Sequence, residues 1–598
     1  MNLTLCVLVA VCAQEPRILE AELFASVGVA ADAERATAGR KWMSSRIAAG
    51  PAPALLRETF DAGVHASTRA DAAVREFMAE LAPMPAFLAA ARAFGVSVSA
   101  PPRARIGDVR AFEGVLERAH REILQAIGSG RDPKLVAPTL HGLLDRALHV
   151  GGELEAEDVA ALRDVGGRLA KVDHRALVQQ AALVLAAVDA LLEPESRAAL
   201  LRLPGSPGGR GVVGTVLLDR VVSFGRLVVG GPGPNEYACD QLAVIVDLGG
   251  DDTYRGPAGG AGVHRRFSLV VDVAGNDRYE ALHDGLGAAT LGVGILLDLA
   301  GNDEYAAEAR SAGFGSGGVG FLADLGGRDT WKLARDSGGV GCYGLGVLLD
   351  LGAENDTATV GPRCLGVGLP GGLGCYVDGG GSDRREAQGA SLAGLVAGVG
   401  IGLPPWLIGG AGLCLDVAGD DVYRLGDFSG GVGDGHGLGV LFDASGADQY
   451  SAGAFALGAA RGGGAGFCLD AEGDDEYSLS AAPGLGAVVD GGLAWAEDRS
   501  GEDRYQLAGD GAGYAAGGGL GVFWDRRGRD TYALRATARA PAASENRRAV
   551  ALAFFADFGA GEDGYEHTGT TRAAGNSRTE RSSASAAHGE VVTVFADR

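Results

Sequence analysis

A short motif that recurs about every 26 residues through the second half of the chain constrains the fold more than any other feature. The motif reads GxGhhhDxxGxDxY, where h is an apolar residue. Its clean copies are VDLGGDDTY (246–254), VDVAGNDRY (271–279), LDLAGNDEY (297–305), ADLGGRDTW (323–331), LDVAGDDVY (415–423), FDASGADQY (442–450), LDAEGDDEY (469–477), EDRSGEDRY (497–505) and WDRRGRDTY (524–532). Degenerate copies are LDLGAENDTA (349–358), VDGGGSDRR (377–385) and ADFGAGEDGY (556–565). The leading aspartates, from Asp247 to Asp557, are 25 to 38 residues apart.

This repeat length, with one apolar run, glycine-rich corners and no helical window between copies, is typical of a parallel β-solenoid. Leucine-rich repeats need an LxxLxL frame that is absent, and propeller blades need about 40 residues or more. The sequence therefore predicts an α plus all-β, multidomain protein. An N-terminal α-helical domain precedes a parallel β-solenoid of about 12 coils, one for each motif copy.

Coils stacked about 4.8 Å apart place identical residues above one another. We expect one aromatic ladder formed by Tyr254, Tyr279, Tyr305, Trp331, Tyr423, Tyr450, Tyr477, Tyr505 and Tyr532. The GxG pairs are expected at corners where φ is positive or two backbones approach closely. Cys375, Cys414 and Cys468 take the place of apolar residues in other copies and are predicted to lie in the core.

Composition divides the chain into five segments. Residues 1–13 have the apolar character of a signal peptide, for which a buried first helix is the alternative. Residues 14–204 show helical periodicity, as in DVRAFEGVLERAHREILQAI (108–127), and are expected to form a domain that covers the N-terminal end of the solenoid. Residues 205–235 form a linker and the first strands, 236–566 the solenoid, and 567–598 a polar tail with a final strand. Export implies a secreted, periplasmic or cell-surface bacterial protein.

The negative charge belongs to the repeats. The net charge of the chain is -24 at pH 7, and residues 1–204 contribute almost none of it. Such a surface repels phosphate backbones, so nucleic acid is not expected as a partner. No segment after residue 13 reads as membrane-spanning, because glycines and two prolines interrupt the most apolar stretch, 391–412. A cell-surface, polysaccharide or protein partner fits these properties better.

Two columns of aspartate are the strongest candidate site. At about 4.8 Å, two carboxylates repel by about 0.9 kcal/mol in water and about 3.5 kcal/mol at an effective dielectric constant of 20. Either hard cations lie between them, or the side chains accept hydrogen bonds from turn N–H groups and face bulk water. The candidate calcium ligands are Asp247, Asp252, Asp272, Asp277, Asp298, Asp303, Asp324, Asp329, Asp416, Asp421, Asp443, Asp448, Asp470, Asp475, Asp498, Asp503, Asp525 and Asp530.

The motif resembles the calcium-binding nonapeptide GGxGxDxUx of the repeats-in-toxin (RTX) family, in which U is a large apolar residue. Gly301, Asp303 and Tyr305 match its second half, whereas Asp298 and Leu299 replace the opening glycine pair. Toxin repeats recur every nine residues, and here one motif occurs per 26. The resemblance implies calcium held by the second aspartate and by backbone carbonyls of adjacent coils. The whole chain also resembles uncharacterised exported bacterial proteins with glycine- and aspartate-rich repeats.

No enzyme motif is evident. A P-loop, HExxH and GxSxG are absent from the sequence, and the GxG pairs open strands instead of a single helix. The irregular polar residues Asp383, Arg384, Arg385, Asp434 and His436 are the candidates for a carbohydrate-active β-helix lyase or hydrolase; His436 also fits an exposed corner. GLPPWLIGG (402–410) fits either a contact loop or a local cap. We therefore expect an exported structural or binding rod without an evident catalytic centre. The alternatives are that enzyme or an interaction scaffold that works through the helical domain.

Overall fold

The computed structural model describes most of the repeat region and parts of the N-terminal region. The described residues are 20–37, 54–56, 70–72, 74, 75, 78, 79, 82–101, 106, 108–128, 140–142, 146, 155–262, 264–388, 396–402, 409–510, 512–536, 549–558, 564–567, 579–586 and 589–597. The expected signal peptide (1–13) and most of the apolar insertion (403–408) lie outside this part of the chain.

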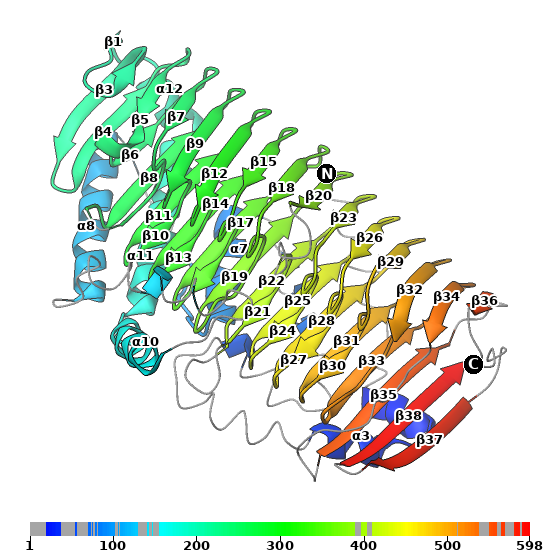
Figure 1. The fold of residues 1–598 in the computed structure, drawn as a ribbon. Coiled ribbons are helices and arrows are strands. Elements are labelled where there is room, and N and C mark those ends of the chain that lie inside the picture. Colours follow the sequence, from blue (N-terminus) through cyan, green and yellow to red (C-terminus); the bar gives the residue numbers. More distant parts are fainter. Residues whose placement is uncertain are drawn as a thin grey trace.

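The repeats form a parallel β-solenoid, which confirms the predicted fold class (Figure 1). Each coil crosses three sheets in turn, which we call sheets A, B and C. In one coil, β11 (Val293–Asp298) lies in sheet A, β12 (Glu304–Ala309) in sheet B and β13 (Gly315–Ser316) in sheet C. Paired residues in successive coils are equivalent motif positions, as in Asp298 with Asp324. About ten coils contribute to all three sheets.

Sheet A is the longest of the three sheets. It contains β1 (Ser206–Pro207), β3 (Thr215–Val222), β4 (Gly225–Gly230), β6 (Val244–Val246), β8 (Phe267–Asp272), β11, β14 (Val319–Asp324), β17 (Leu345–Asp350), β19 (Leu373–Asp378), β22 (Ala411–Asp416), β25 (Leu438–Asp443), β28 (Ala465–Asp470), β31 (Leu493–Asp498), β33 (Gly519–Asp525), β35 (Ala549–Asp557), β37 (Thr579–Ala586) and β38 (Gly589–Asp597).

Sheets B and C form the other two sides. Sheet B contains β2 (Val212–Val213), β5 (Glu236–Ala238), β7 (Thr253–Arg255), β9 (Arg278–His283), β12, β15 (Thr330–Leu333), β18 (Thr357–Val360), β20 (Arg384–Ala387), β23 (Val422–Arg424), β26 (Gln449–Ala452), β29 (Glu476–Leu479), β32 (Arg504–Asp510), β34 (Thr531–Ala536) and β36 (Gly564–His567). Sheet C contains β10 (Ala289–Thr290), β13, β16 (Gly341–Cys342), β21 (Gly400–Ile401), β24 (Gly433–Asp434), β27 (Ala460–Arg461) and β30 (Val488–Val489). A 3-10 turn, η2 (Cys239–Gln241), follows β5.

Sheet A is apolar on both faces, as expected of a parallel sheet covered on each side. In β11, Ile295 belongs to the outer apolar cluster that includes the helices, whereas Leu296 belongs to the interior cluster with Tyr305. The alternation of strand side chains therefore turns Asp298 to the interior with Leu296. Gly294 faces the same way, and a Cβ atom there would lie 2.0 Å from the Ala288 carbonyl oxygen. The second glycine of the motif thus allows two backbones to approach closely, as predicted.

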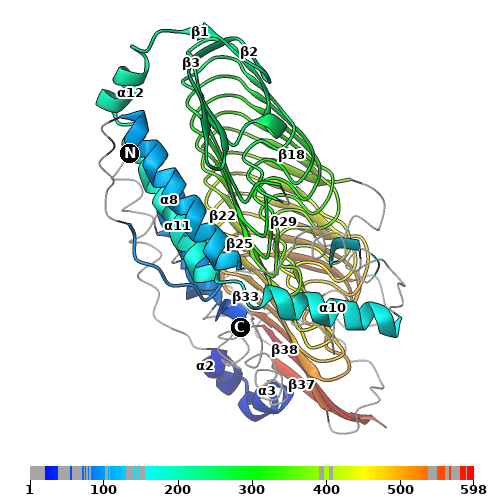
Figure 2. The same cartoon turned by 90° about the vertical axis from the view of Figure 1, so that its left-hand side faces the viewer.

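The helices run along the outer face of sheet A (Figure 2). They are α2 (Glu20–Ser26), α3 (Ala30–Thr37), α7 (Pro83–Ala93), α8 (Val109–Ile127), α10 (Ala156–Leu169), α11 (His174–Leu191) and α12 (Pro194–Leu200). α11 packs on β11 and β14, α7 on β17 and β19, and α3 on β33 and β35. The expectation that the helical segment covers only the N-terminal end of the solenoid is therefore wrong. The apolar outer residues of sheet A extend over many coils, and the helices bury them along that length.

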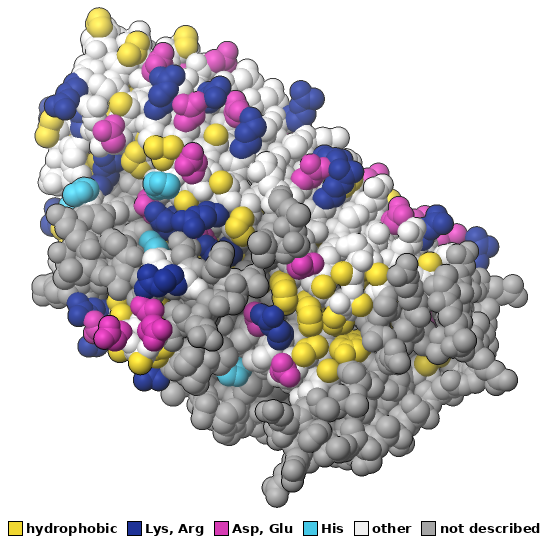
Figure 3. Space-filling model, in the orientation of Figure 1, with side chains coloured by type: hydrophobic (Ala, Val, Ile, Leu, Met, Phe, Trp, Pro, Cys, Tyr) yellow, Lys and Arg dark blue, Asp and Glu magenta, His cyan; other side chains and the backbone are white. Residues whose placement is uncertain are grey.

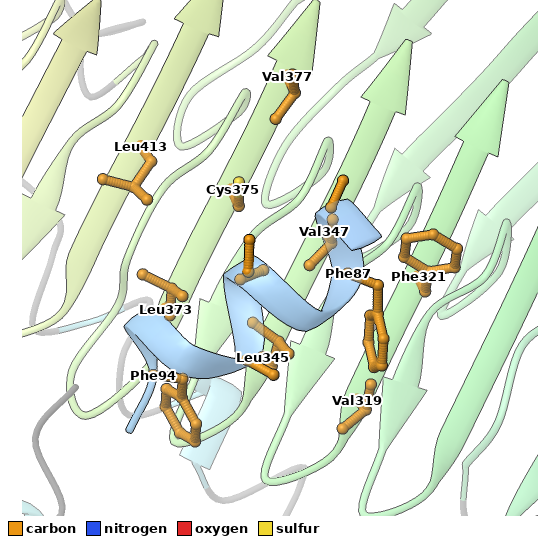
Figure 4. Packing of buried hydrophobic residues seen from close by; sticks show 14 of the residues in the cluster. Phe87, Phe94, Val319, Phe321, Leu345, Val347, Leu373, Cys375, Val377 and Leu413 are labelled. Atoms are coloured by element: carbon orange, nitrogen blue, oxygen red, sulfur yellow. The ribbon is translucent and has the colours of Figure 1, made fainter. Parts of the chain in front are cut away.

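Aromatic and apolar side chains join the helices to sheet A. Phe87 of α7 meets Phe321 edge to face with ring centroids 5.3 Å apart (Figure 4), and Phe24 of α2 meets Trp495 in the same way at 6.2 Å. Asp108 caps α8 by accepting a hydrogen bond from the Ala111 N–H group, as the sequence predicts. No single described helix is long and apolar enough to cross a membrane; α11 and α12 meet that test together but are bent by 76°.

Antiparallel strands close both ends of sheet A. At the start, β1, β3 and β4 pair antiparallel before the parallel order begins at β6. At the end, β38 pairs with β35, and β37 folds back on β38. The final strand predicted in the tail is confirmed, whereas β37, which reads TERSSASA, was not anticipated. Its small polar residues gave no apolar alternation.

Candidate functional site: the aspartate columns

Both aspartate columns line the interior of the solenoid. We call the leading aspartates the first column and the GxD aspartates the second column. All eighteen predicted site residues are at most 3% exposed. One oxygen from each of Asp277, Asp298 and Asp303 lies within 4.8 Å of the other two. The structure therefore brings the candidate ligands together and removes them from water.

In the N-terminal part, the first column receives hydrogen bonds on both carboxylate oxygens. The Tyr279 hydroxyl donates to Asp298 Oδ2 over 2.5 Å, and the Ala300 N–H group donates to Asp298 Oδ1 over 3.2 Å. Asp247, Asp272 and Asp324 are bonded in the same way. We call this run, from Tyr237 to Trp331, the N-terminal stack. Its rings stack, with centroids 3.9 to 5.1 Å apart.

The second column forms a continuous ladder with the backbone. The Asp277 N–H group donates to Asp303 Oδ1 of the next coil over 2.5 Å, and Asp303 N–H donates in turn to Asp329 Oδ1. The ladder runs from Asn235 to Asp530 with distances of 2.5 to 2.8 Å. The expected bonds from turn N–H groups are thus present. The expected contact with bulk water is wrong, because the corner glycines let adjacent coils close over the carboxylates.

The other oxygen of the second column has no hydrogen-bond donor among the described residues. This holds for Oδ2 of Asp252, Asp277, Asp303, Asp329, Asp356, Asp421, Asp448, Asp475 and Asp503. Burial and the nearby Asp272 carboxylate raise the pKa of Asp277 to about 10. Burial and the Asp470 carboxylate do the same for Asp475, whose pKa also rises to about 10. These oxygens need either a proton or a cation.

In the C-terminal part, the tyrosine hydroxyls lie between two carboxylates. Tyr477 Oη is 3.0 Å from Asp470 Oδ2 of its own coil and 3.1 Å from Asp498 Oδ2 of the next. Tyr423, Tyr450 and Tyr505 bridge in the same way. We call the run from Tyr423 to Tyr532 the C-terminal stack. Its rings stack with centroids 4.9 Å apart, so the predicted aromatic ladder is confirmed in two separate runs.

A buried arginine separates the two stacks. Arg385 pairs with Tyr423 in sheet B and so takes the place of a ladder tyrosine, and Ala358 precedes it in the column. Its Nη2 atom lies 2.5 Å from Asp378 Oδ2, 3.0 Å from Asp383 Oδ2 and 2.8 Å from Asp416 Oδ2. Tyr376 of sheet A fills interior space next to it, with its hydroxyl 2.7 Å from Asp378 Oδ2. One positive charge thus lies among carboxylates of two coils.

Several of these roles were missed from the sequence. Asp350, Asp356, Asp378 and Asp383 occupy the columns but were left out of the candidate set because their copies are degenerate. Six residues separate Asp350 from Asp356, one more than in the clean copies, and that extra residue hid the match. The interior position of Arg385 was readable from its alignment with the tyrosines.

The irregular polar residues do not gather into one site. Asp383 and Arg385 are buried in the interior below sheet B. Asp434 lies in sheet C and pairs through both oxygens with Arg461, and His436 lies at a corner with a φ of 69°. The structure therefore does not bring the proposed lyase or hydrolase residues together.

The fold and its columns define the class as an acidic parallel β-solenoid with an α-helical face. Cys375, Cys414 and Cys468 are buried free thiols, as predicted. Comparison with known proteins finds no matching family model, no matching curated protein and no matching solved structure.

Proposed function

We propose that this protein is an exported structural or binding rod whose aspartate columns bind calcium. The observation that carries the proposal is the repeated buried carboxylate oxygen without a donor, at up to three carboxylates per site. Calcium prefers carboxylate and carbonyl oxygens and would offset the repulsion within each column. Arg385 supports this reading, because at one position the chain itself supplies a cation among the same carboxylates.

The resemblance to RTX repeats supports the same ion. It rests on the GxDxY half of the motif, and Asp303 and its equivalents are the residues that would hold calcium in both. The added first column is specific to this chain and would give each site a second carboxylate. Export fits calcium, which extracellular modules bind with dissociation constants of about 10⁻⁴ to 10⁻³ M.

The outer face of sheet B offers a surface to a partner. Arg255, Glu280, Glu304 and Lys332 alternate in charge along successive strands and pair with neighbouring coils. Figure 3 shows acidic and basic side chains interspersed on the face in view. Such a mixed, regularly spaced surface suits a polysaccharide, a cell-surface component or another protein better than a nucleic acid.

Thermal unfolding with and without calcium tests the proposal. Calcium at about 100 times its dissociation constant stabilises the folded state by about 2.7 kcal/mol per independent site. We expect a higher Tm in calcium than in EDTA, and bound calcium in the protein after dialysis against a metal-free buffer. An unchanged Tm together with the absence of bound metal would refute calcium binding. Export is checked separately by sequencing the N-terminus of the mature protein.

A further inference from the structure

The two stacks supply different numbers of donors to the same carboxylates. In the N-terminal stack, Asp298 accepts one hydroxyl and one N–H hydrogen bond, so each of its oxygens has its own donor. In the C-terminal stack, Oδ1 of Asp416, Asp443, Asp470, Asp498 and Asp525 has no donor among the described residues. The first column is therefore compensated in one half and undercompensated in the other.

The hydroxyl groups of the C-terminal stack do not make up this deficit. A tyrosine hydroxyl carries one proton and donates one hydrogen bond. Tyr450 lies 2.9 Å from Asp443 Oδ2 and 3.0 Å from Asp470 Oδ2, so it cannot donate to both at once. Two ionised carboxylates share one proton at each such level.

Each coil of the C-terminal stack thus holds two unsatisfied oxygens. In the coil of Asp470, these are Oδ1 of Asp470 and Oδ2 of Asp475, and both residues are 2% exposed. The coil of Asp443 and Asp448 repeats the arrangement at 1% exposure. Carboxylates of Asp416, Asp421 and Asp443 also meet within 4.8 Å across two coils. Carboxylates of the N-terminal stack come equally close, but only their second column lacks a donor.

We propose that calcium binds within the C-terminal stack and not within the N-terminal stack. The ligands would be the carboxylates of Asp416, Asp421, Asp443, Asp448, Asp470, Asp475, Asp498 and Asp503. One divalent ion neutralises the two carboxylates of a coil, and oxygen-only ligands suit calcium. This inference rests on the proposed calcium binding and states where it occurs.

A pair of matched variants tests the location. Asp475→Asn and Asp277→Asn change equivalent motif positions, both 2% exposed. In each variant the amide oxygen can still accept the backbone N–H bond, while the amide nitrogen supplies a donor at the unsatisfied oxygen. We expect Asp475→Asn to lose about one bound calcium per chain and part of the calcium-induced rise in Tm. Asp277→Asn should keep the wild-type values for both.

The outcomes separate the two claims. Wild-type protein without bound calcium would refute both the proposed function and this location, and would indicate protons on the carboxyls instead. Calcium in the wild type with equal losses in both variants, or a loss only in Asp277→Asn, would refute the location alone. Asp448→Asn repeats the test in a neighbouring coil if Asp475→Asn does not fold.

Terbium gives a second readout that depends on distance. Tb³⁺ takes calcium sites, and nearby tyrosines sensitise its luminescence. We expect Tyr477→Phe to lower tyrosine-sensitised terbium luminescence and Tyr279→Phe to leave it unchanged. Equal luminescence in the two variants would count against the C-terminal location.

Discussion

The N-terminal and C-terminal stacks are built from one motif and differ in how their tyrosines meet the first column. In the first, Tyr279 donates to Asp298 of the next coil. In the second, Tyr477 also touches Asp470 of its own coil. The change begins at Arg385, whose Nη2 atom bridges Asp378 of its own coil and Asp416 of the next. A guanidinium has enough protons for this bridging position, whereas a hydroxyl has only one. The comparison teaches that the bridging position suits a cation.

Removal of Arg385 should have the largest effect on this boundary. Arg385→Gln leaves four buried carboxylates, those of Asp378, Asp383, Asp416 and Asp421, without their cation. Loss of one partner of a buried ion pair destabilises by about 3 to 5 kcal/mol. We expect a loss of this size in the free energy of urea-induced unfolding.

The neighbouring Arg384 provides the control. Its side chain is 41% exposed and pairs with Glu386 on the outer face of sheet B. Arg384→Gln should change the stability by less than about 1 kcal/mol, because exposed ion pairs contribute little. Similar losses in the two variants would show that the interior position of Arg385 carries no special role.

Tyrosine-to-phenylalanine substitutions compare the stacks directly. In Tyr279→Phe, Asp298 Oδ2 loses the hydroxyl donor that the structure gives it. A buried acceptor left unpaired costs about 1 to 3 kcal/mol. In Tyr477→Phe, Asp470 keeps Tyr450 and Asp498 keeps Tyr505 as neighbours. We therefore expect a smaller loss, near about 1 kcal/mol.

Phenylalanine retains the ring stacking in both variants, so the difference reports on the hydroxyl group. Chemical denaturation in EDTA measures it without calcium. A larger loss for Tyr477→Phe than for Tyr279→Phe would break the comparison, because it would mean that the bridging hydroxyls are the more important donors.

The repeat period was enough to predict the solenoid and its stacked columns. Any in-register parallel stack with this motif places Asp298 above Asp324 and Tyr305 above Trp331, so these pairings followed from spacing alone. The placement of the helices did not follow. Ile295 and Leu296 are both apolar in the sequence, and nothing in it shows that one faces the helices and the other the interior.

The hydrogen bonds of the site depended on details beyond spacing. Whether Tyr477 reaches one carboxylate or two is decided by shifts of a fraction of an ångström between coils, which a one-dimensional pattern does not encode. The burial of Asp303 was also missed, since an aspartate in a turn is most often exposed. Its interior position depends on the close approach of Gly301 to the Gly275 carbonyl oxygen in the preceding coil.

The smallest expected effect concerns protons, for which the two stacks should behave alike. The pKa of Asp277 and that of Asp475 both rise to about 10 in the folded state, while an unfolded aspartate has a pKa of about 3.9. Between these values the folded chain keeps a proton that the unfolded chain has lost. Stability from these groups is therefore full below about pH 4 and falls as the pH rises toward 10, by up to about 1.4 kcal/mol per pH unit for each group.

Unfolding free energies between pH 5 and 9 in EDTA measure this slope. We expect Asp277→Asn and Asp475→Asn each to reduce it by about 1 kcal/mol per pH unit, because each removes one such group. Asp474→Asn, which changes an exposed neighbour, should leave the slope unchanged. A reduced slope in only one of the two variants would extend the difference between the stacks from cations to protons. Equal reductions would confine that difference to the first column and its tyrosines.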